Sequence, residues 1–190
     1  MKNPTLDEGY ITLYLPVAHC FSHVVTAVVL EKEIKNDLIL LVDAPEYSEV
    51  TLKTPQMQTQ DLQLILHYIE DRFPYPPLYP SEPLALARVM QEELYWMEYL
   101  RLLGTHKLTA SKINDISHKI FNDLSSWQYL FNGSFQIIDC MIGCFYAHCI
   151  QKSITIKMSQ PQLINYCKLV LSRPCIKKAA SKLEMIAPTS

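Results

Sequence analysis

A thiol and a hydroxyl lie close together near the start of the first expected helix. Cys20 directly follows His19, and Ser22 comes two residues later. A cysteine at a helix N-terminus with a histidine beside it can have a lowered pKa, and the resulting thiolate is a nucleophile. Ser22 has a simpler interpretation, because serine is a preferred N-cap and a helical apolar pattern begins at Val24. This segment is the best candidate for catalysis in the chain.

The other cysteines and the histidines do not form a metal-binding pattern. The sequence has no Cys-x-x-Cys pair, and Cys140 and Cys144 lie one helical turn apart on an apolar segment, where cysteine usually packs as a small hydrophobe. Four glycines in the whole chain leave little material for a phosphate-binding loop. We therefore expect no metal and no cofactor.

Composition and charge favour a cytoplasmic globular protein. Residues 1–10 include acidic side chains and lack the apolar core of a secretory signal. The longest apolar run, residues 137–150, contains Asp139 and His148 and is too short to cross a bilayer. The net charge of −2 gives no reason to expect direct, sequence-specific binding of nucleic acid.

An amphipathic helix followed by a proline-rich connector marks a domain boundary. Asp61 is a good N-cap, and the apolar residues behind it recur at helical spacing: Leu62, Ile65, Leu66, Ile69 and Phe73. Closely spaced prolines then remove backbone donors and stiffen the chain: Pro74, Pro76, Pro77, Pro80 and Pro83. We expect a first domain over residues 1–76, a linker over 77–83 and a second domain over 84–190.

The first domain has the element order βαβ-ββα. We expect a strand at 11–14, a helix at 22–30 and a strand at 38–42, followed by short extended pieces at 50–54 and 56–60 and the helix that begins at Asp61. The continuous apolar run at 38–42 is typical of a strand covered on both faces.

The second domain is expected to be a helical bundle. Its first helix shows one apolar stripe at helical spacing, made of Leu86, Met90, Leu94, Met97 and Leu100. A second stripe contains Ile113, Ile116, Ile120, Leu124 and Trp127. Residues 135–150 are apolar on most sides and predict a central helix, with two more helices at 161–171 and 174–185. Asp139 is expected to accept backbone N–H groups at the start of the central helix.

This α/β plus all-α arrangement resembles the glutathione transferase architecture, a thioredoxin-like domain followed by a helical bundle. Residues 68–78 resemble the sequence Tyr-Leu-Asp-Glu-Arg-Phe-Pro-His-Pro-Pro-Leu of the stringent starvation protein A family almost position by position. Residues 21–23 and 30–32 are similar to its Tyr-Ser-His and Ala-Glu-Lys signatures, and residues 135–140 to its Phe-Ser-Leu-Val-Asp-Cys. The resemblance covers most of the chain and is thin at 35–49 and 126–133.

The resemblance implies a non-enzymatic regulator that binds bacterial RNA polymerase and changes promoter use during stress. The family's Pro-His-Pro contact surface corresponds here to Pro74-Tyr75-Pro76, so the expected partner-binding residues are Arg72, Pro74, Tyr75, Pro76, Pro77 and Tyr79. The alternative is that these prolines only end the helix and stiffen the linker. The fold also implies a homodimer, or a heterodimer with a related subunit, with exposed anchors at Met90, Tyr95 or Met97.

Glutathione chemistry in this fold would need groups that the sequence has changed. His19 falls at the position of a glutaredoxin-like nucleophile. Val50 replaces the cis-proline, and because a cis bond before valine costs about 3 kcal/mol, we expect a trans bond there. The acidic-Ser pair that would hold the γ-glutamyl group becomes Asp61-Leu62, and leucine has no hydroxyl. The alternative function is a divergent glutathione transferase or thiol oxidoreductase that uses Cys20 or Ser22.

Overall fold

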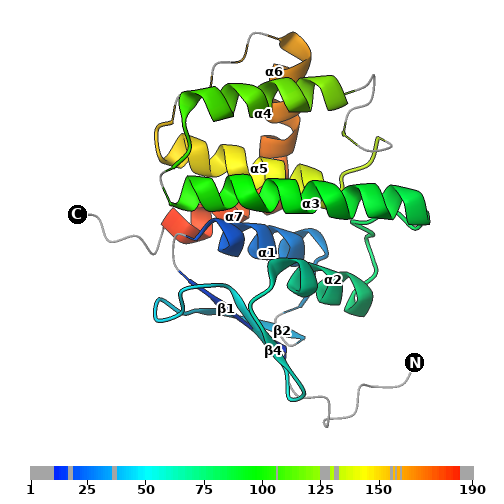
Figure 1. Cartoon of the computed structure of the whole chain (residues 1–190). Coiled ribbons are helices and arrows are strands. Elements are labelled where there is room, and N and C mark those ends of the chain that lie inside the picture. The colour runs from blue at the N-terminus through cyan, green and yellow to red at the C-terminus, as the bar shows by residue number, and fades with distance from the viewer. Residues whose placement is uncertain are drawn as a thin grey trace.

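The structure is a computed structural model, and it describes residues 11–16, 19–35, 38–105, 107–124, 129–130, 133–154, 156, 158 and 160–184. It has a small sheet with two helices at one end and a helical bundle at the other (Figure 1). The first half contains β1 (Ile11–Leu15), α1 (Cys20–Glu31), β2 (Ile39–Asp43), β3 (Thr51–Lys53), β4 (Gln58–Thr59) and α2 (Leu62–Arg72). The second half contains α3 (Pro83–Gly104), α4 (Ala110–Asp123), α5 (Ile137–Gln151), α6 (Pro161–Ser172) and α7 (Pro174–Glu184).

The sheet has the strand order β2-β1-β3-β4. β1 pairs in parallel with β2 and antiparallel with β3, and β3 pairs antiparallel with β4. The predicted βαβ-ββα order is therefore confirmed. Its α1 crossover places Leu13 and Leu52, which are paired neighbours, on the face that the helices cover.

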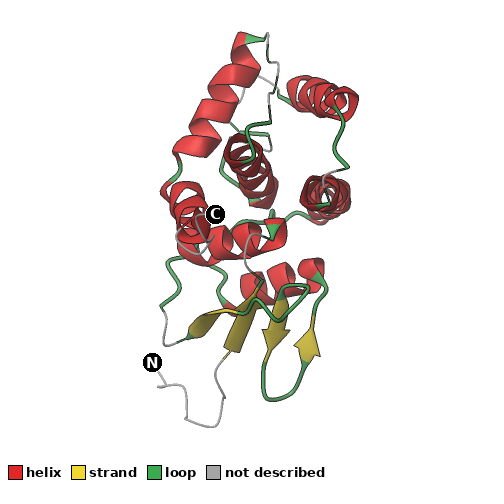
Figure 2. Cartoon of the chain, turned by 90° about the vertical axis from the view of Figure 1, so that its left-hand side faces the viewer, coloured by secondary structure: helices red, strands yellow, loops and turns green. Residues whose placement is uncertain are grey.

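β2 corrects one expectation. It is an edge strand, and its second residue, Leu40, is 47% exposed. Figure 2 shows α1 and α2 on one side of the sheet, and the described residues place no helix on the other side. The apolar run of β2 therefore did not indicate burial on both faces, because only the sheet order decides which strand lies at the edge.

α3 corrects a second expectation. Its buried side chains are Val89, Glu93, Trp96, Leu100 and Leu103, whereas the predicted stripe shares only Leu100 with this set. Leu94 is 58% exposed and Met90 is 36% exposed. Both sets have helical spacing. On the buried face, Trp96 packs edge-on against Phe145 of α5, and Glu93 has polar partners that permit its burial.

α1 joins the two halves. It packs against α2 within the first half and against α3, α5 and α7 within the bundle. The buried apolar side chains form one continuous cluster from Leu13 and Val24 to Trp96 and Phe145. α5 is buried along almost its whole length, as the apolar pattern predicted for a central helix. The boundaries 1–76, 77–83 and 84–190 stay a prediction, and Trp127 lies outside the described residues.

None of the helices in the described ranges is both long enough and apolar enough to cross a membrane.

Candidate functional site

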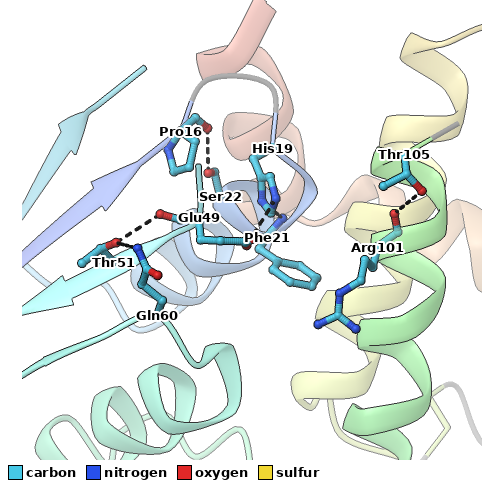
Figure 3. A network of polar contacts seen from close by, with 9 residues as sticks. All are labelled: Pro16, His19, Phe21, Ser22, Glu49, Thr51, Gln60, Arg101 and Thr105. Carbon is cyan, nitrogen blue, oxygen red and sulfur yellow. Dashed lines mark hydrogen bonds and ion pairs between the residues drawn. The ribbon is translucent and has the colours of Figure 1, made fainter. Parts of the chain in front are cut away.

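A cleft of about 380 Å³ opens at the N-terminal end of α1, where this helix faces the C-terminal part of α3. His19, Cys20 and Phe21 line it from α1, and Leu100 and Arg101 line it from α3. The loop before β3 completes the wall with Pro45, Tyr47, Ser48 and Glu49. Figure 3 shows Phe21 and Arg101 pointing toward each other across this cleft, and the guanidinium carbon is 5.9 Å from the ring centroid.

His19 acts as the N-cap of α1. Its Nδ1 accepts the backbone N–H of Phe21 at 3.3 Å, and its Nε2 lies 3.5 Å from a carboxylate oxygen of Glu49. Burial lowers the pKa of His19 and outweighs the opposite effect of Glu49, so the imidazole is neutral at physiological pH. A neutral ring with Nδ1 as acceptor carries its proton on Nε2, the atom that faces Glu49.

Cys20 does not have the lowered pKa that a reactive thiol requires. Its side chain is buried, and this burial raises the thiol pKa to about 11 although Lys152 acts in the opposite direction. The sequence placed Cys20 correctly at a helix N-terminus. Desolvation outweighs the helix end at this position, because a thiolate loses its hydration when it is buried.

Ser22 has a different role from the predicted N-cap. The helix begins at Cys20, two residues before the predicted start, so the cap position falls on His19. The Ser22 hydroxyl is fully buried and donates to the carbonyl oxygen of Pro16 at 2.8 Å. It does not line the cleft.

The positions that correspond to a glutathione site are occupied by internal contacts. The Glu49–Val50 peptide bond is trans, as predicted, and Val50 is buried. The Thr51 hydroxyl donates to the Glu49 carbonyl at 3.1 Å and accepts from Gln60 Nε2 at 3.1 Å (Figure 3). Asp61 caps α2 by accepting the N–H of Leu64 at 3.0 Å, and Leu62 is buried. Neither Asp61 nor Leu62 lines the cleft.

The proline-rich turn lies at the opposite end of α1. Tyr75 at its tip is 83% exposed, and the Tyr75–Pro76 bond is cis. Arg72, Pro74 and Pro77 are also exposed, and Pro76 is half-buried. Tyr79 does not share this surface, because it points inward and its hydroxyl donates to Glu93. Five of the six expected partner-binding residues thus lie together on the surface.

A buried ion pair supports this turn, and sequence reasoning missed it. Lys32 follows the last residue of α1, and its ammonium lies 2.7 Å from the carboxylate of Glu70 in α2. The same ammonium donates to the carbonyls of Phe73 at 2.7 Å and Pro76 at 2.9 Å. No local pattern could have identified the pair, because its members belong to different helices that only the fold brings together.

Glu93 forms a second buried polar cluster that sequence reasoning missed. It lies fully buried in α3, and its carboxylate accepts from Tyr79, from Gln63 Nε2 at 3.1 Å and from His67 Nε2 at 3.3 Å. Burial raises the pKa of Glu93. The cluster ties α2 and the turn segment to α3, which gives Tyr79 a role in holding the two halves together.

Asp139 takes the predicted position at the start of α5. It accepts the N–H of Gln136 at 2.9 Å and of Leu130 at 3.3 Å, and the hydroxyl of Tyr166 donates to it at 2.8 Å. Burial raises its pKa to about 6. The described residues contain no group of three or more His, Cys, Asp or Glu side chains able to hold a metal ion.

Comparison with known proteins identifies the fold and relatives. No protein family model matches the chain. A stringent starvation protein A homolog of Coxiella burnetii is 24% identical over 200 residues, which cover 94% of this chain and 95% of the relative. A homolog of the same name from Haemophilus influenzae is 24% identical over 162 residues, with 75% and 76% covered. The resemblance to the stringent starvation protein A family is confirmed by these relatives.

Solved glutathione transferases share the fold. A transferase homolog from Burkholderia, solved with bound glutathione, superimposes with a TM-score of 0.68 at 17% identity and covers 93% of this chain and 99% of its own. Isozyme E7 from Drosophila melanogaster gives a TM-score of 0.73 at 16% identity, with 93% and 95% covered. The expected glutathione transferase-like fold is therefore confirmed.

Proposed function

We propose that this protein is a non-enzymatic, cytoplasmic regulator that binds bacterial RNA polymerase during stress or starvation, with the proline-rich turn as its contact surface. The observation that carries the proposal is the exposure of Tyr75 in a turn whose Phe73 and Pro76 carbonyls accept from the buried Lys32 ammonium. The turn corresponds to the segment through which the resemblance implies polymerase contact. The relatives' name supports a role in starvation.

The chemistry of Tyr75 suits a binding hot spot. An aromatic side chain has a large apolar surface and a polar tip, and only two torsion angles must be fixed on binding. Residues of this kind at the centre of an interface contribute about 2 kcal/mol or more. Pro74 and Pro77 beside it lose little conformational freedom on binding, because their φ angles are already fixed.

The state of the cleft supports a function without catalysis. A thiol with a pKa of about 11 is almost entirely protonated at pH 7. The Ser22 hydroxyl is fully buried and bonded to Pro16. Val50 and Leu62 stand where the resemblance requires a cis-proline and a serine, so the groups that would hold glutathione have been replaced.

We propose further that the protein dimerises through an exposed face of α3. Among the expected anchors, Met90 is exposed, whereas the Tyr95 hydroxyl donates to Tyr99 at 2.9 Å and its ring lies 4.9 Å from the Lys119 ammonium. Leu94 follows Met90 by one helical turn and is more exposed, so Met90 and Leu94 form the apolar centre of this face. Leu94→Glu should convert the dimer to a monomer in analytical ultracentrifugation. If the protein forms a heterodimer instead, we propose that a related subunit binds this same face.

Affinity capture tests the polymerase proposal. The immobilised protein should retain polymerase subunits and sigma factor from a bacterial lysate, and Tyr75→Ala should not. Tyr47→Ala is the matched control, because it removes an aromatic side chain from the cleft and should retain polymerase. Equal capture by wild type and Tyr75→Ala would show that the turn is not the contact surface. Absence of polymerase from the wild-type eluate would show that polymerase is not the partner.

The alternative, a divergent transferase or thiol oxidoreductase, is favoured by one observation. The cleft is open, and Cys20 forms part of its wall in a fold that binds glutathione in the Burkholderia homolog. A saturable thermal shift with glutathione, together with turnover that Cys20→Ser abolishes, would establish that alternative.

A further inference from the structure

The ammonium of Lys32 is completely surrounded by acceptors. Its side chain has no exposed surface, and it contacts Glu70, the Phe73 carbonyl and the Pro76 carbonyl at 2.7, 2.7 and 2.9 Å. An ammonium has three N–H donors, so each donor has one partner. A buried charge is tolerated only when it is paired and hydrogen-bonded in this way.

The acceptors of Lys32 lie on both sides of Tyr75. Phe73 precedes it by two residues and Pro76 follows it directly, so one ammonium fixes the chain before and after the exposed side chain. Glu70 extends the contact by accepting the N–H of Leu78 at 3.1 Å. The turn from Phe73 to Leu78 is thus held at three backbone groups by a single ion pair, which we call the Lys32–Glu70 clamp.

The clamp also suits the electrostatics of α2. Phe73 is the C-cap of this helix, and the carbonyls at a helix C-terminus lack intrahelical partners and carry partial negative charge. The Lys32 ammonium supplies a donor and a positive charge at this point. The turn itself has no regular secondary structure between Phe73 and Ser81. The Ile137 N–H of α5 donates to the Leu78 carbonyl at 3.0 Å and fixes the far end of the turn, whereas the clamp holds the backbone on either side of Tyr75.

We propose that Lys32 is a positioning residue for partner binding. It cannot touch a partner because its side chain is buried, and it acts by fixing the backbone that presents Tyr75 to solvent. Fixing a binding residue before the complex forms reduces the entropy lost on association, so the clamp increases affinity without adding a contact. This inference rests on the proposed function for its binding partner, but the restraint on the turn can be tested without any partner.

Limited proteolysis tests the restraint directly. Trypsin cleaves after Arg72, and the Arg72–Phe73 bond lies directly before the clamped carbonyls. Lys32→Met keeps the apolar stem and removes the three donors, so the bond should be cut at least tenfold faster than in wild type. Glu70→Gln keeps an acceptor for Leu78 and for Lys32 but removes the counter-charge of the buried ammonium, so its cleavage rate should lie between those of wild type and Lys32→Met. Equal cleavage of Lys32→Met and wild type would overturn the proposal whether or not polymerase is the partner.

Binding measurements test whether the restraint acts through Tyr75. Lys32→Met should weaken polymerase binding at least tenfold, and in the Tyr75→Ala background it should change binding by less than twofold, because the side chain that Lys32 is proposed to position is then absent. An undiminished effect of Lys32→Met in that background would overturn the positioning role.

A control separates positioning from loss of stability. Leu163→Ala creates a cavity in α6, far along the chain from the turn, and should lower the melting temperature while leaving polymerase affinity unchanged. Loss of binding by Leu163→Ala equal to that of Lys32→Met would assign the effect to global stability and overturn the proposal. If Lys32→Met does not fold, Glu70→Ala removes the partly exposed member of the clamp and should give the same faster cleavage.

Discussion

Polar side chains near both ends of α1 bond to other protein groups, but these bonds have different consequences at the two ends. At its N-terminal end, the polar groups of His19, Ser22 and Thr51 bond to neighbouring protein groups around an open cleft. At its C-terminal end, Lys32 also bonds only to protein, but the backbone it holds carries Tyr75 outward. Internal bonds therefore occupy these three groups at the cleft, whereas at the turn they fix the backbone on both sides of an exposed tyrosine.

The difference shows how a substrate-binding fold can support a function based on contacts. A catalytic pocket needs polar groups that remain partly unsatisfied until the substrate arrives. A docking surface needs side chains fixed by other residues and still exposed. The thioredoxin-like half of this protein meets the second requirement at the turn, and its buried Cys20 does not meet the first.

The largest expected effect concerns the reactivity of Cys20. Because burial raises its pKa to about 11 from an ordinary value of 9.0, the thiolate fraction at pH 7 is about 100-fold lower than that of a free thiol. Alkylation of Cys20 by iodoacetamide, followed by peptide mass spectrometry, should therefore be at least about 100-fold slower in the folded protein than in denaturant. A rate in the folded protein at or above the denatured rate would indicate an activated thiol. The N-terminal end of α1 would then carry a reactive group, contrary to the comparison drawn above.

The middle of α1 gives the next largest effect, through pH. His23 is buried there beside His148 of α5, with ring centroids 5.3 Å apart, and burial lowers its pKa to about 3, with smaller contributions from His148 and His19. The folded state therefore binds fewer protons at this site than the unfolded state between pH 3 and 6.5, and stability falls as the pH decreases through this range. At pH 5 the loss is about 2 kcal/mol.

Comparison of wild type with His23→Leu isolates this contribution. The difference in unfolding free energy between the two proteins should change by about 2 kcal/mol in favour of His23→Leu when the pH is lowered from 7.5 to 5. Asp139, with a pKa raised to about 6, acts in the opposite direction and is common to both proteins, so it cancels. Urea denaturation at the two pH values measures the difference, and a constant difference would show that folding does not lower the pKa of His23.

Two tyrosines provide a smaller and directly matched test. Tyr47 at the cleft stacks on Tyr14, with centroids 4.7 Å apart and an interplanar angle of 9°. Tyr47→Ala should lower the unfolding free energy by about 1 kcal/mol, whereas Tyr75→Ala should change it by less than about 0.5 kcal/mol. Thermal denaturation of both variants checks the order. A larger loss for Tyr75→Ala would mean that this side chain serves the fold instead of a partner.

The smallest expected effect is that of glutathione. Because Val50 and Leu62 stand where the resemblance requires a cis-proline and a serine for glutathione, the ligand at 1 mM should stabilise the protein by less than about 0.1 kcal/mol, which corresponds to a dissociation constant above about 5 mM. Differential scanning fluorimetry measures this, with a glutathione transferase as positive control. A saturable shift in melting temperature would show that glutathione binds and would favour the cleft as a substrate site.

The sequence predicted the elements well because their signals are local. Helical spacing behind Asp61 located α2, and the apolar segment at 137–150 located α5. The predictions failed where the exposure of a side chain depends on which elements pack against it. Leu40 is apolar and exposed because β2 lies at the sheet edge, and Leu94 is exposed because α3 turns Glu93 and Trp96 inward.

The candidate site was predictable to a similar extent. The exposed turn around Tyr75 followed from its prolines and from the resemblance. The Lys32–Glu70 clamp and the Glu93 cluster did not, because each joins groups from separate elements. The pKa of Cys20 could not be fixed for the same reason, since the sequence shows the helix N-terminus but not the burial that opposes it.

The most direct test of contact through the turn is an equilibrium titration of purified RNA polymerase holoenzyme with fluorescently labelled wild type, Tyr47→Ala and Tyr75→Ala. We expect equal affinity for wild type and Tyr47→Ala, and a loss of about 30-fold or more for Tyr75→Ala, as for a hot spot of about 2 kcal/mol. Weaker binding by Tyr47→Ala with unchanged binding by Tyr75→Ala would place the functional surface at the cleft and rule out contact through the turn.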